Sequence, residues 1–208
     1  MGNACKWSQR LPENALKEHD RQSHGEPVAA KVRNQDFTCE RPDQKWGVDI
    51  SYIWTSAGWL YLAIVVDPYS RRIVGREARN RTKKALAISA LNTAIAIRQP
   101  TQGLIQHSDR RSPYASHAYC TLRKAHNLIP SMRGKGNCND HAMVETVCTT
   151  IKAELLWRTA FQSRDAAINA IGAYIDGFVY PRAQTFRQAK SPIAFEASIR
   201  KSHSEAFQ

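Results

Sequence analysis

The chain is 208 residues long, and its 30 Lys and Arg against 18 Asp and Glu give a formal net charge of +12. This length is sufficient for one substantial domain, and the basic balance is typical of proteins that bind a polyanion such as nucleic acid. No apolar stretch approaches the roughly 18 residues of a membrane span, no secretion signal is evident, and the five scattered cysteines form no Cys-x-x-Cys pair, so we expect a cytoplasmic protein without a disulfide framework or zinc cluster.

The first part of the chain is polar and has no sustained apolar period, so we expect residues 1–40 to form a poorly ordered arm. Three strands are predicted next, because apolar segments are separated by short turn signals. The shortness of these turns favours an antiparallel arrangement of the strands, which cover residues 45–54, 59–66 and 71–77.

The pattern within these strands predicts which faces they bury. In the first strand, Trp46 and Val48 alternate with Gly47 and Asp49, so Asp49 should point away from the apolar face. The second strand is apolar on both alternations, as expected of a strand that is covered on both sides. We expect Trp59, Tyr61 and Trp157 to lie in the core.

The remaining segments alternate between helical and extended patterns, which favours an α/β fold with a mixed sheet. Asp140 and Ser163 are suitable N-caps for the last two helices. The predicted elements are a helix over 82–98, a strand over 103–107, a helix over 114–127, a strand over 128–132, and helices over about 140–157 and 164–180.

Three carboxylates stand at positions where separate elements could present them. Asp49 lies on the first strand, Asp109 follows the carboxyl end of the strand 103–107, and Glu145 lies on a helix. Open α/β sheets place functional groups at the carboxyl ends of strands, and Mg²⁺ prefers hard oxygen ligands. Taken singly, each carboxylate is also an ordinary strand, turn or first-turn residue. On the helix, Glu145 shares a line with Lys152, away from the apolar stripe.

The segments around the carboxylates, residues 46–52, 107–110 and 135–146, resemble the integrase core of bacterial insertion-sequence transposases, which shares the Asp-Asp-Glu chemistry of retroviral integrases. The similarity extends over residues 37–154 and continues in pieces to residue 196. It implies a ribonuclease-H-like fold, with the first carboxylate on the first strand, the second after the fourth strand and the third on a helix.

The resemblance also implies an activity. Asp49, Asp109 and Glu145 would hold two Mg²⁺ or Mn²⁺ ions, with which water cuts a transposon end and the freed 3′ hydroxyl attacks a target strand. The spacing of the carboxylates alone predicts only metal-dependent phosphoryl transfer. His107 could support the site through a hydrogen bond. The candidate contacts to the DNA backbone are Arg110, Arg133, Lys135 and Lys152, for which solvated surface charges are the ordinary alternative.

The sequence departs from the family pattern in several places. Arg111 and Pro113 replace the usual Gly and Gln, and Asn139 and His141 replace the usual Tyr and Asn. The C-terminal family signature is missing from residues 179–190, and residues 1–36 contain no recognisable helix-turn-helix. We therefore expect residues 41–180 to form the catalytic core and residues 181–208 a tail with a degraded signature.

The leading hypothesis is a transposase catalytic core that cleaves and transfers DNA strands. Its expected partners are DNA, further copies of the chain on DNA, and an upstream helix-turn-helix protein or fusion. The departures leave it open whether the chain is an enzyme. One alternative is an inactive remnant that binds DNA nonspecifically or regulates a full-length transposase. Another is a nuclease that degrades RNA in hybrids, which nothing in the flanking residues supports.

Overall fold

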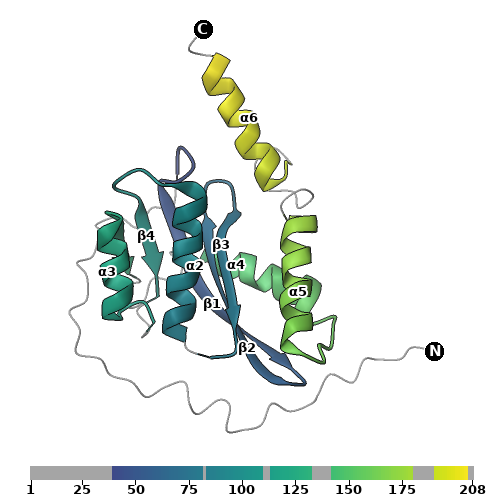
Figure 1. Cartoon of the computed structure of the whole chain (residues 1–208). Coiled ribbons are helices and arrows are strands. Elements are labelled where there is room, and N and C mark those ends of the chain that lie inside the picture. Colours follow the sequence, from purple (N-terminus) through teal and green to yellow (C-terminus); the bar gives the residue numbers. More distant parts are fainter. Residues whose placement is uncertain (1–38, 82, 110–112, 133–141, 180–189, 206–208) are drawn as a thin grey trace.

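The computed structural model describes residues 39–81, 83–109, 113–132, 142–179 and 190–205 (Figure 1). Five strands form one sheet in the order β3-β2-β1-β4-β5. Strands β1, β2 and β3 pair antiparallel, whereas β4 is parallel to both β1 and β5. This confirms the predicted mixed sheet. The strands are β1 (Lys45–Thr55), β2 (Gly58–Asp67), β3 (Arg72–Arg79), β4 (Ile105–Ser108) and β5 (Ile129–Met132).

Helices cover both faces of the sheet (Figure 1). On one face, α2 (Lys83–Arg98) and α3 (His117–Ala125) pack over the strands. On the other face lie α4 (Ala142–Ile151) and α5 (Arg164–Tyr174), which continue directly into the π-helical segments η1 (Lys152–Leu156) and η2 (Ile175–Val179). The last helix is α6 (Pro192–Glu205).

Side-chain alternation in β1 and β2 divides the interior into two apolar cores. In β1, Trp46 and Val48 are buried against α2, whereas Ile53 packs into the core beneath α4 and α5. Asp49 has the parity of Ile53, so it lies on the α4 face, away from Trp46 and Val48 as predicted. Strand β2 contributes to both cores, with Ala63 and Val65 on the α2 side and Leu60, Leu62, Ile64 and Val66 on the α4 side.

Most predicted elements are present, with bounds that differ by a few residues. Ser163 caps α5, and its Oγ accepts a hydrogen bond from the backbone N–H of Ala166 at 3.1 Å. The helix predicted to end near Trp157 does so, although its last turn is π-helical. The expectation that Trp157 lies in the core is wrong, because 62% of it is exposed at the end of that turn.

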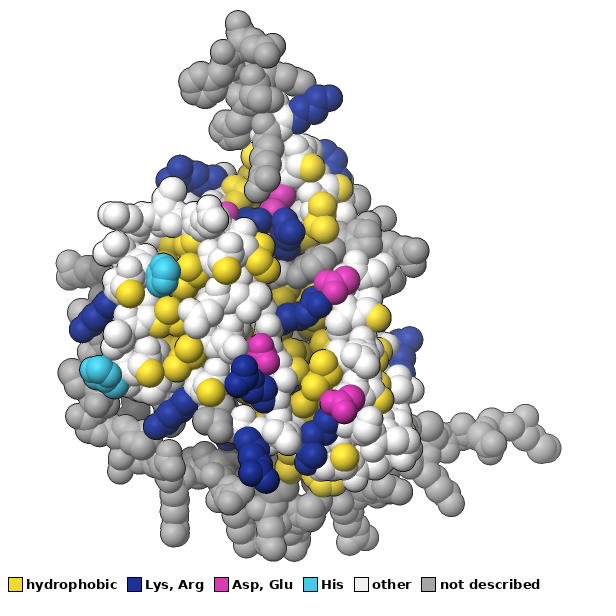
Figure 2. All heavy atoms as spheres, in the orientation of Figure 1, with side chains coloured by type: hydrophobic (Ala, Val, Ile, Leu, Met, Phe, Trp, Pro, Cys, Tyr) yellow, Lys and Arg dark blue, Asp and Glu magenta, His cyan; other side chains and the backbone are white. Residues whose placement is uncertain are grey.

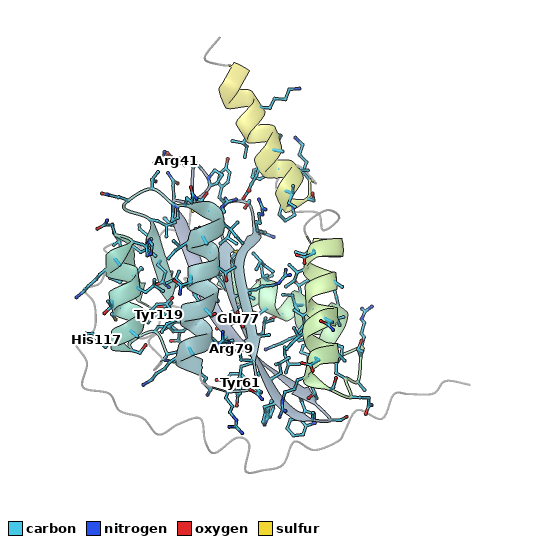
Figure 3. All side chains as sticks on the ribbon, in the orientation of Figure 1. Arg41, Tyr61, Glu77, Arg79, His117 and Tyr119 are labelled. Atoms are coloured by element: carbon cyan, nitrogen blue, oxygen red, sulfur yellow. The ribbon has the colours of Figure 1, made fainter. Side chains whose placement is uncertain are left out.

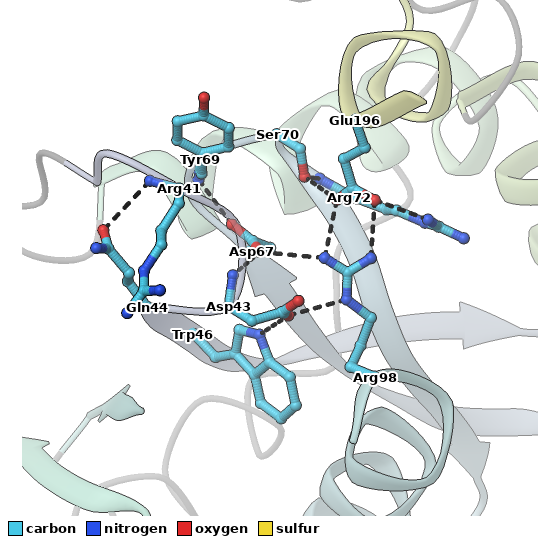
Figure 4. Close-up of polar contacts among 10 residues, drawn as sticks. All are labelled: Arg41, Asp43, Gln44, Trp46, Asp67, Tyr69, Ser70, Arg72, Arg98 and Glu196. Atoms are coloured by element: carbon cyan, nitrogen blue, oxygen red, sulfur yellow. Dashed lines mark hydrogen bonds and ion pairs between the residues drawn. The ribbon is translucent and has the colours of Figure 1, made fainter. Parts of the chain in front are cut away.

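Helix α6, which the sequence pattern does not predict, is fixed to the domain by a buried ionic cluster (Figure 4). Glu196 accepts hydrogen bonds from Ser70 Oγ at 2.7 Å, from Arg72 Nη1 at 2.9 Å and from both Nη atoms of Arg98 at 2.8 and 3.0 Å. The side chains of Glu196 and Arg98 are each only 4% exposed. The rest of α6 projects away from the sheet (Figure 1). We call Asp43, Asp67, Arg72, Arg98 and Glu196 the Glu196 cluster.

Several sequence predictions lie outside the described residues. They concern the arm up to residue 38, the cap Asp140, the candidate DNA contacts Arg110, Arg133 and Lys135, the departures at Arg111, Asn139 and His141, and residues 180–189. Within the described part of the chain, no helix is long and apolar enough to cross a membrane.

Candidate active site

The parallel pairing of β1 and β4 brings Asp49 and Asp109 together. Val48 and Ser108 are register partners at the end of this pairing, and each is followed directly by one of the two aspartates. Neighbouring strands are about 4.8 Å apart, so the two carboxylates leave adjacent strands side by side. Both residues are half-buried. Two of the three predicted carboxylates, Asp49 and Asp109, therefore lie next to each other at the carboxyl end of β4.

Tyr114, five residues after Asp109, is buried in the core on the α2 side of the sheet. The residue is 3% exposed, and its ring packs edge-on against that of Tyr119 with 5.6 Å between the centroids. Burial raises the pKa of the Tyr114 hydroxyl well above its ordinary value, and the negative charges of Asp49 and Asp109 raise it further. Both aspartates are therefore within electrostatic range of this buried hydroxyl.

Helix α4 crosses the face of β1 on which Asp49 lies. Val144 packs directly over Gly47. The contact is so close that a Cβ at position 47 would overlap the Val144 methyl group Cγ2. One turn further along α4, the buried thiol of Cys148 is a hydrogen-bonding neighbour of Asp49. Burial and the charge of Asp49 raise the pKa of Cys148 to about 12, so the thiol stays protonated and acts as an inert packing group.

Glu145 follows Val144 and is exposed on the outer side of α4. It lines a groove of about 460 Å³ with Thr146, Thr149, Thr150, Ala153 and Glu154. Helix α4 therefore crosses the strand that bears Asp49, and the Glu145 side chain faces the groove.

The three carboxylates are not arranged as a metal-binding site in this structure. Among the described residues, no group of three or more His, Cys, Asp or Glu side chains is arranged to hold a metal ion. Asp49 and Asp109 are brought together, and Glu145 is positioned on the adjoining helix. The donor set consists of hard carboxylate oxygens, which fits Mg²⁺ or Mn²⁺ and does not fit thiophilic metals.

Two other predicted residues lie near this position. Lys152 is half-buried at the start of η1, and its charge acts on the Cys148 thiol. His107 is buried on β4, where its Nδ1 is 3.3 Å from Ser131 Oγ on β5. That hydrogen bond ties β4 to β5 two residues before Asp109.

Sequence reasoning missed Tyr114 and the contact of Cys148 with Asp49. Cys148 lies on the buried side of α4, and no sequence pattern indicates that this side of the helix meets Asp49. Tyr114 stands five residues after Asp109 in a segment predicted only as helix. Its position along the chain does not reveal that its ring is buried against Tyr119.

A second groove of about 460 Å³ lies elsewhere, at the beginning of α2 and α5, and is lined by Arg79, Arg81 and Arg164 among others. Lysine and arginine side chains gather at the lower end of this face (Figure 2). Arg79 bonds to its neighbour Glu77 at 3.0 Å (Figure 3). The Nζ of Lys83 lies 4.9 Å from the ring centre of Tyr52. This surface gives the domain a positively charged end.

The mixed five-stranded sheet with helices on both faces is a ribonuclease-H-like fold. Residues 40–138 match the integrase core domain family. The chain is similar in sequence to proteins of bacterial insertion sequences.

The relatives are similar over most of this chain. An uncharacterized 31 kDa protein of insertion element IS600 from Shigella sonnei is 39% identical over 174 residues, 83% of this chain and 64% of the relative. Transposase InsF for insertion sequence IS3A from Escherichia coli strain K12 is 39% identical over 154 residues, 74% of this chain and 54% of the relative. The chain thus spans between about half and two thirds of the curated relatives it matches.

Solved structures agree on the fold. The integrase catalytic core domain of HTLV-2 in complex with magnesium has a TM-score of 0.59 at 16% identity, covering 76% of this chain and 98% of the other. A chain of the simian T-cell lymphotropic virus intasome, bound to PP2A regulatory subunit B56 gamma, has a TM-score of 0.60 at 17% identity and covers 83% of this chain and 59% of the other.

Proposed function

We propose that this transposase core cleaves DNA strands and transfers them to new sites with the help of divalent cations, Mg²⁺ or Mn²⁺. The observation that carries this proposal is the β1–β4 register, which sets Asp49 beside Asp109 under the helix that bears Glu145. Bound cations, two in our proposal, would supply an activated water and neutralise charge on the phosphoryl oxygens. Asp49 and Asp109 would hold them from the sheet, and Glu145 would complete the ligand set from α4.

The positively charged surface supports DNA as the partner. Phosphate contacts fix a protein on DNA without reading its sequence, and the net charge of +12 favours such contacts. Lys152 lies on the helix that carries Glu145, next to the acidic site. In our proposal Lys152, Arg110, Arg133 and Lys135 grip the DNA backbone beside the reacting phosphate.

The relatives extend beyond the region that matches this chain, so the complete reaction is proposed to require more than the core. Recognition of transposon ends would come from an upstream helix-turn-helix part, either fused or separate. Several copies of the chain would assemble on DNA, because two ends must be joined to one target. We propose that residues 41–180 form the catalytic unit and that the protein acts in the cytoplasm.

Nicking and joining assays test the proposal. The purified chain is incubated with supercoiled plasmid, a labelled oligonucleotide with a free 3′ hydroxyl, and Mn²⁺. Metal catalysis is worth several kcal/mol, so Asp109→Asn should slow nicking by about 10²-fold to 10³-fold. Asp165→Asn is the matched control, since Asp165 is an exposed aspartate on α5. Equal activity of both variants and the parent would refute the proposal.

The same experiment separates the alternatives. An inactive remnant would bind plasmid with an affinity that falls steeply with salt, would not nick it, and would be indifferent to metal and to Asp109→Asn. A hybrid-specific nuclease would cut the RNA strand of an RNA–DNA duplex and would join no DNA ends.

A further inference from the structure

Three arginines from distant parts of the chain line the groove at the beginning of α2 and α5. Arg79 ends β3, Arg81 follows it before α2, and Arg164 is the first residue of α5. The groove holds about 460 Å³, and Asp165 is the one acidic residue among its described lining residues. These side chains therefore leave the lining with an excess of positive charge. We call this groove, defined by Arg79, Arg81 and Arg164, the arginine groove.

Two of the three guanidinium groups keep donors for a ligand. The Nε of Arg164 donates to the backbone carbonyl of Trp59 at 3.1 Å, which fixes the side chain. The two Nη atoms of Arg164 have no acceptor within the described part of the chain, and the exposed Arg81 has no partner there either. Arg79 is tied by hydrogen bonds to Glu77 and to Ser89 of α2. The groove thus combines one anchored and one open arginine.

Guanidinium donors in a planar fork match the oxygen atoms of a phosphate group. A further cation, Lys83, stands two residues after Arg81, with its Nζ 4.9 and 5.7 Å from the ring centres of Tyr52 and Tyr61. Lysine and arginine side chains gather at this end of the domain (Figure 2). The charge and the donors of the arginine groove are therefore those that bind a phosphate backbone.

The distance from the arginine groove to the candidate active site follows from the strand register. Trp59, whose carbonyl anchors Arg164, is the register partner of Trp54, and Trp54 stands five residues after Asp49 on β1. At about 3.3 Å per residue this separation is about 17 Å along the strand. Helix α5 covers the same face of the sheet as α4. A DNA strand advances about 3.4 Å per nucleotide, so one duplex can reach both places.

We propose that the arginine groove is a second DNA-binding surface, which holds the phosphate backbone about five nucleotides from the reacting phosphate. The inference rests on the proposed function, because it takes DNA as the substrate and Asp49 as part of the reaction centre. The groove would bind DNA of any sequence, since phosphate contacts position a protein without reading the bases. It adds to the contact proposed for Lys152, which lies on the helix of Glu145.

Salt-dependent DNA binding tests the inference. The affinity of the full chain for a labelled duplex longer than one helical turn is measured by fluorescence anisotropy over a range of salt concentrations. Loss of two phosphate contacts in Arg81→Gln/Arg164→Gln should lower the slope of log affinity against log salt by about 2. Arg81→Gln alone should lower it by about 1. Arg81 has no partner among the described residues, so this single variant separates lost binding from misfolding, which circular dichroism checks.

Arg41→Gln is the matched control for Arg81→Gln. Arg41 is an exposed arginine that also lines a groove, together with Asp43 and Lys45. It lies at the opposite end of the sheet from Arg79 (Figure 3). The change in net charge is the same in both variants, so a general effect of charge would lower both slopes equally. We expect Arg41→Gln to keep the slope of the parent.

Plasmid nicking gives a second readout. At saturating plasmid, Arg81→Gln/Arg164→Gln should nick within about twofold of the parent, and below saturation it should be slower, because the groove contributes binding and no chemistry. A slope equal to that of the parent, an equal loss in Arg41→Gln, or a slower saturated rate with unchanged affinity would overturn the inference. So would unchanged DNA binding with a loss of self-association in sedimentation, which would assign the groove to a second copy of the chain.

The two proposals fail in distinguishable ways. If Asp109→Asn abolishes nicking but Arg81→Gln/Arg164→Gln keeps the slope of the parent, the proposed function stands and the arginine groove is not a DNA contact. If the parent does not nick plasmid and the slopes fall as expected, the groove binds DNA and the proposed function fails. If the parent does not bind DNA, both proposals fail.

Discussion

Val144 occupies the space above Gly47 that a side chain on β1 would need, because a Cβ at position 47 would overlap Val144 Cγ2. The missing side chain lets α4 lie close to the strand that carries Asp49, so this contact sets the separation between the helix of Glu145 and the first aspartate. We expect Gly47→Ala to destabilise the domain by about 1 to 3 kcal/mol through overpacking. A displacement of about 1 Å can cost about 10²-fold in rate, and plasmid nicking should fall accordingly.

A compensating substitution checks this interpretation. Val144→Ala removes the overlapping methyl group, so the Gly47→Ala/Val144→Ala double variant should recover most of the nicking rate. Gly177→Ala is the control, since no heavy atom lies within 4 Å of a Cβ at that position. If the folded double variant still does not nick plasmid, the close approach of α4 to β1 does not determine the position of Glu145 relative to Asp49.

Glu196 fixes α6 to the domain through Arg98, Arg72 and Ser70. Removing one partner of a buried ion pair leaves an uncompensated charge and costs about 3 to 5 kcal/mol. Glu196→Gln should lower the free energy of unfolding by this amount, as measured by urea denaturation at pH 7. Asp176→Asn breaks the exposed pair with Arg76, and it should cost less than about 1 kcal/mol.

The contribution of Glu196 should depend on pH with a defined sign. Burial opposes its ionisation, but hydrogen bonds from Arg98 and Ser70 and the nearby positive charges hold the pKa of Glu196 below the ordinary 4.5. A lowered pKa stabilises the fold above pH 4.5, and the effect is lost as pH falls through the lowered value. The stability difference between the parent and Glu196→Gln should therefore shrink in acid. A difference that is constant from pH 7 to pH 3 would contradict this.

Asp67 should have the opposite pH dependence. Burial raises its pKa from 3.8 to about 6 and outweighs the backbone hydrogen bonds from Asp43 and Tyr69 and the charge of Arg98, which lies 3.5 Å away. A raised pKa gives stability that is complete below pH 3.8 and is lost as pH rises through about 6. Relative to Asp67→Asn, the parent should lose on the order of 2 to 3 kcal/mol across that window. Parallel stability curves for the two proteins would refute this.

Lys152 should contribute to DNA binding without reading sequence. Loss of one phosphate contact lowers the slope of log affinity against log salt by about 1, uniformly across sequences. We expect this for Lys152→Ala in fluorescence anisotropy with short duplexes. Lys124→Ala is the control, because Lys124 is an exposed lysine on α3, on the other side of the sheet. Equal slopes for Lys152→Ala and the parent would remove Lys152 from the DNA interface.

Much of the fold follows from local pattern. The alternation in β1, the doubly apolar β2 and the cap Ser163 identify their elements because side-chain periodicity and turn chemistry act over a few residues. Helix α6 is not predicted, because its docking depends on Glu196 meeting Arg72 and Arg98, which are more than ninety residues away in the chain. The prediction that Trp157 is buried is wrong for a similar reason. The hydrophobicity of a residue does not reveal whether another element covers it.

For the site, the sequence by itself determined which carboxylates are candidates and which elements carry them, because motif and periodicity are local properties of the chain. Only the tertiary structure decided that β1 and β4 pair in the register that brings Asp49 beside Asp109, and that Gly47 lets α4 approach the strand. These relationships depend on strand register and on packing between distant segments, which the free energy of the whole core sets and no short segment encodes.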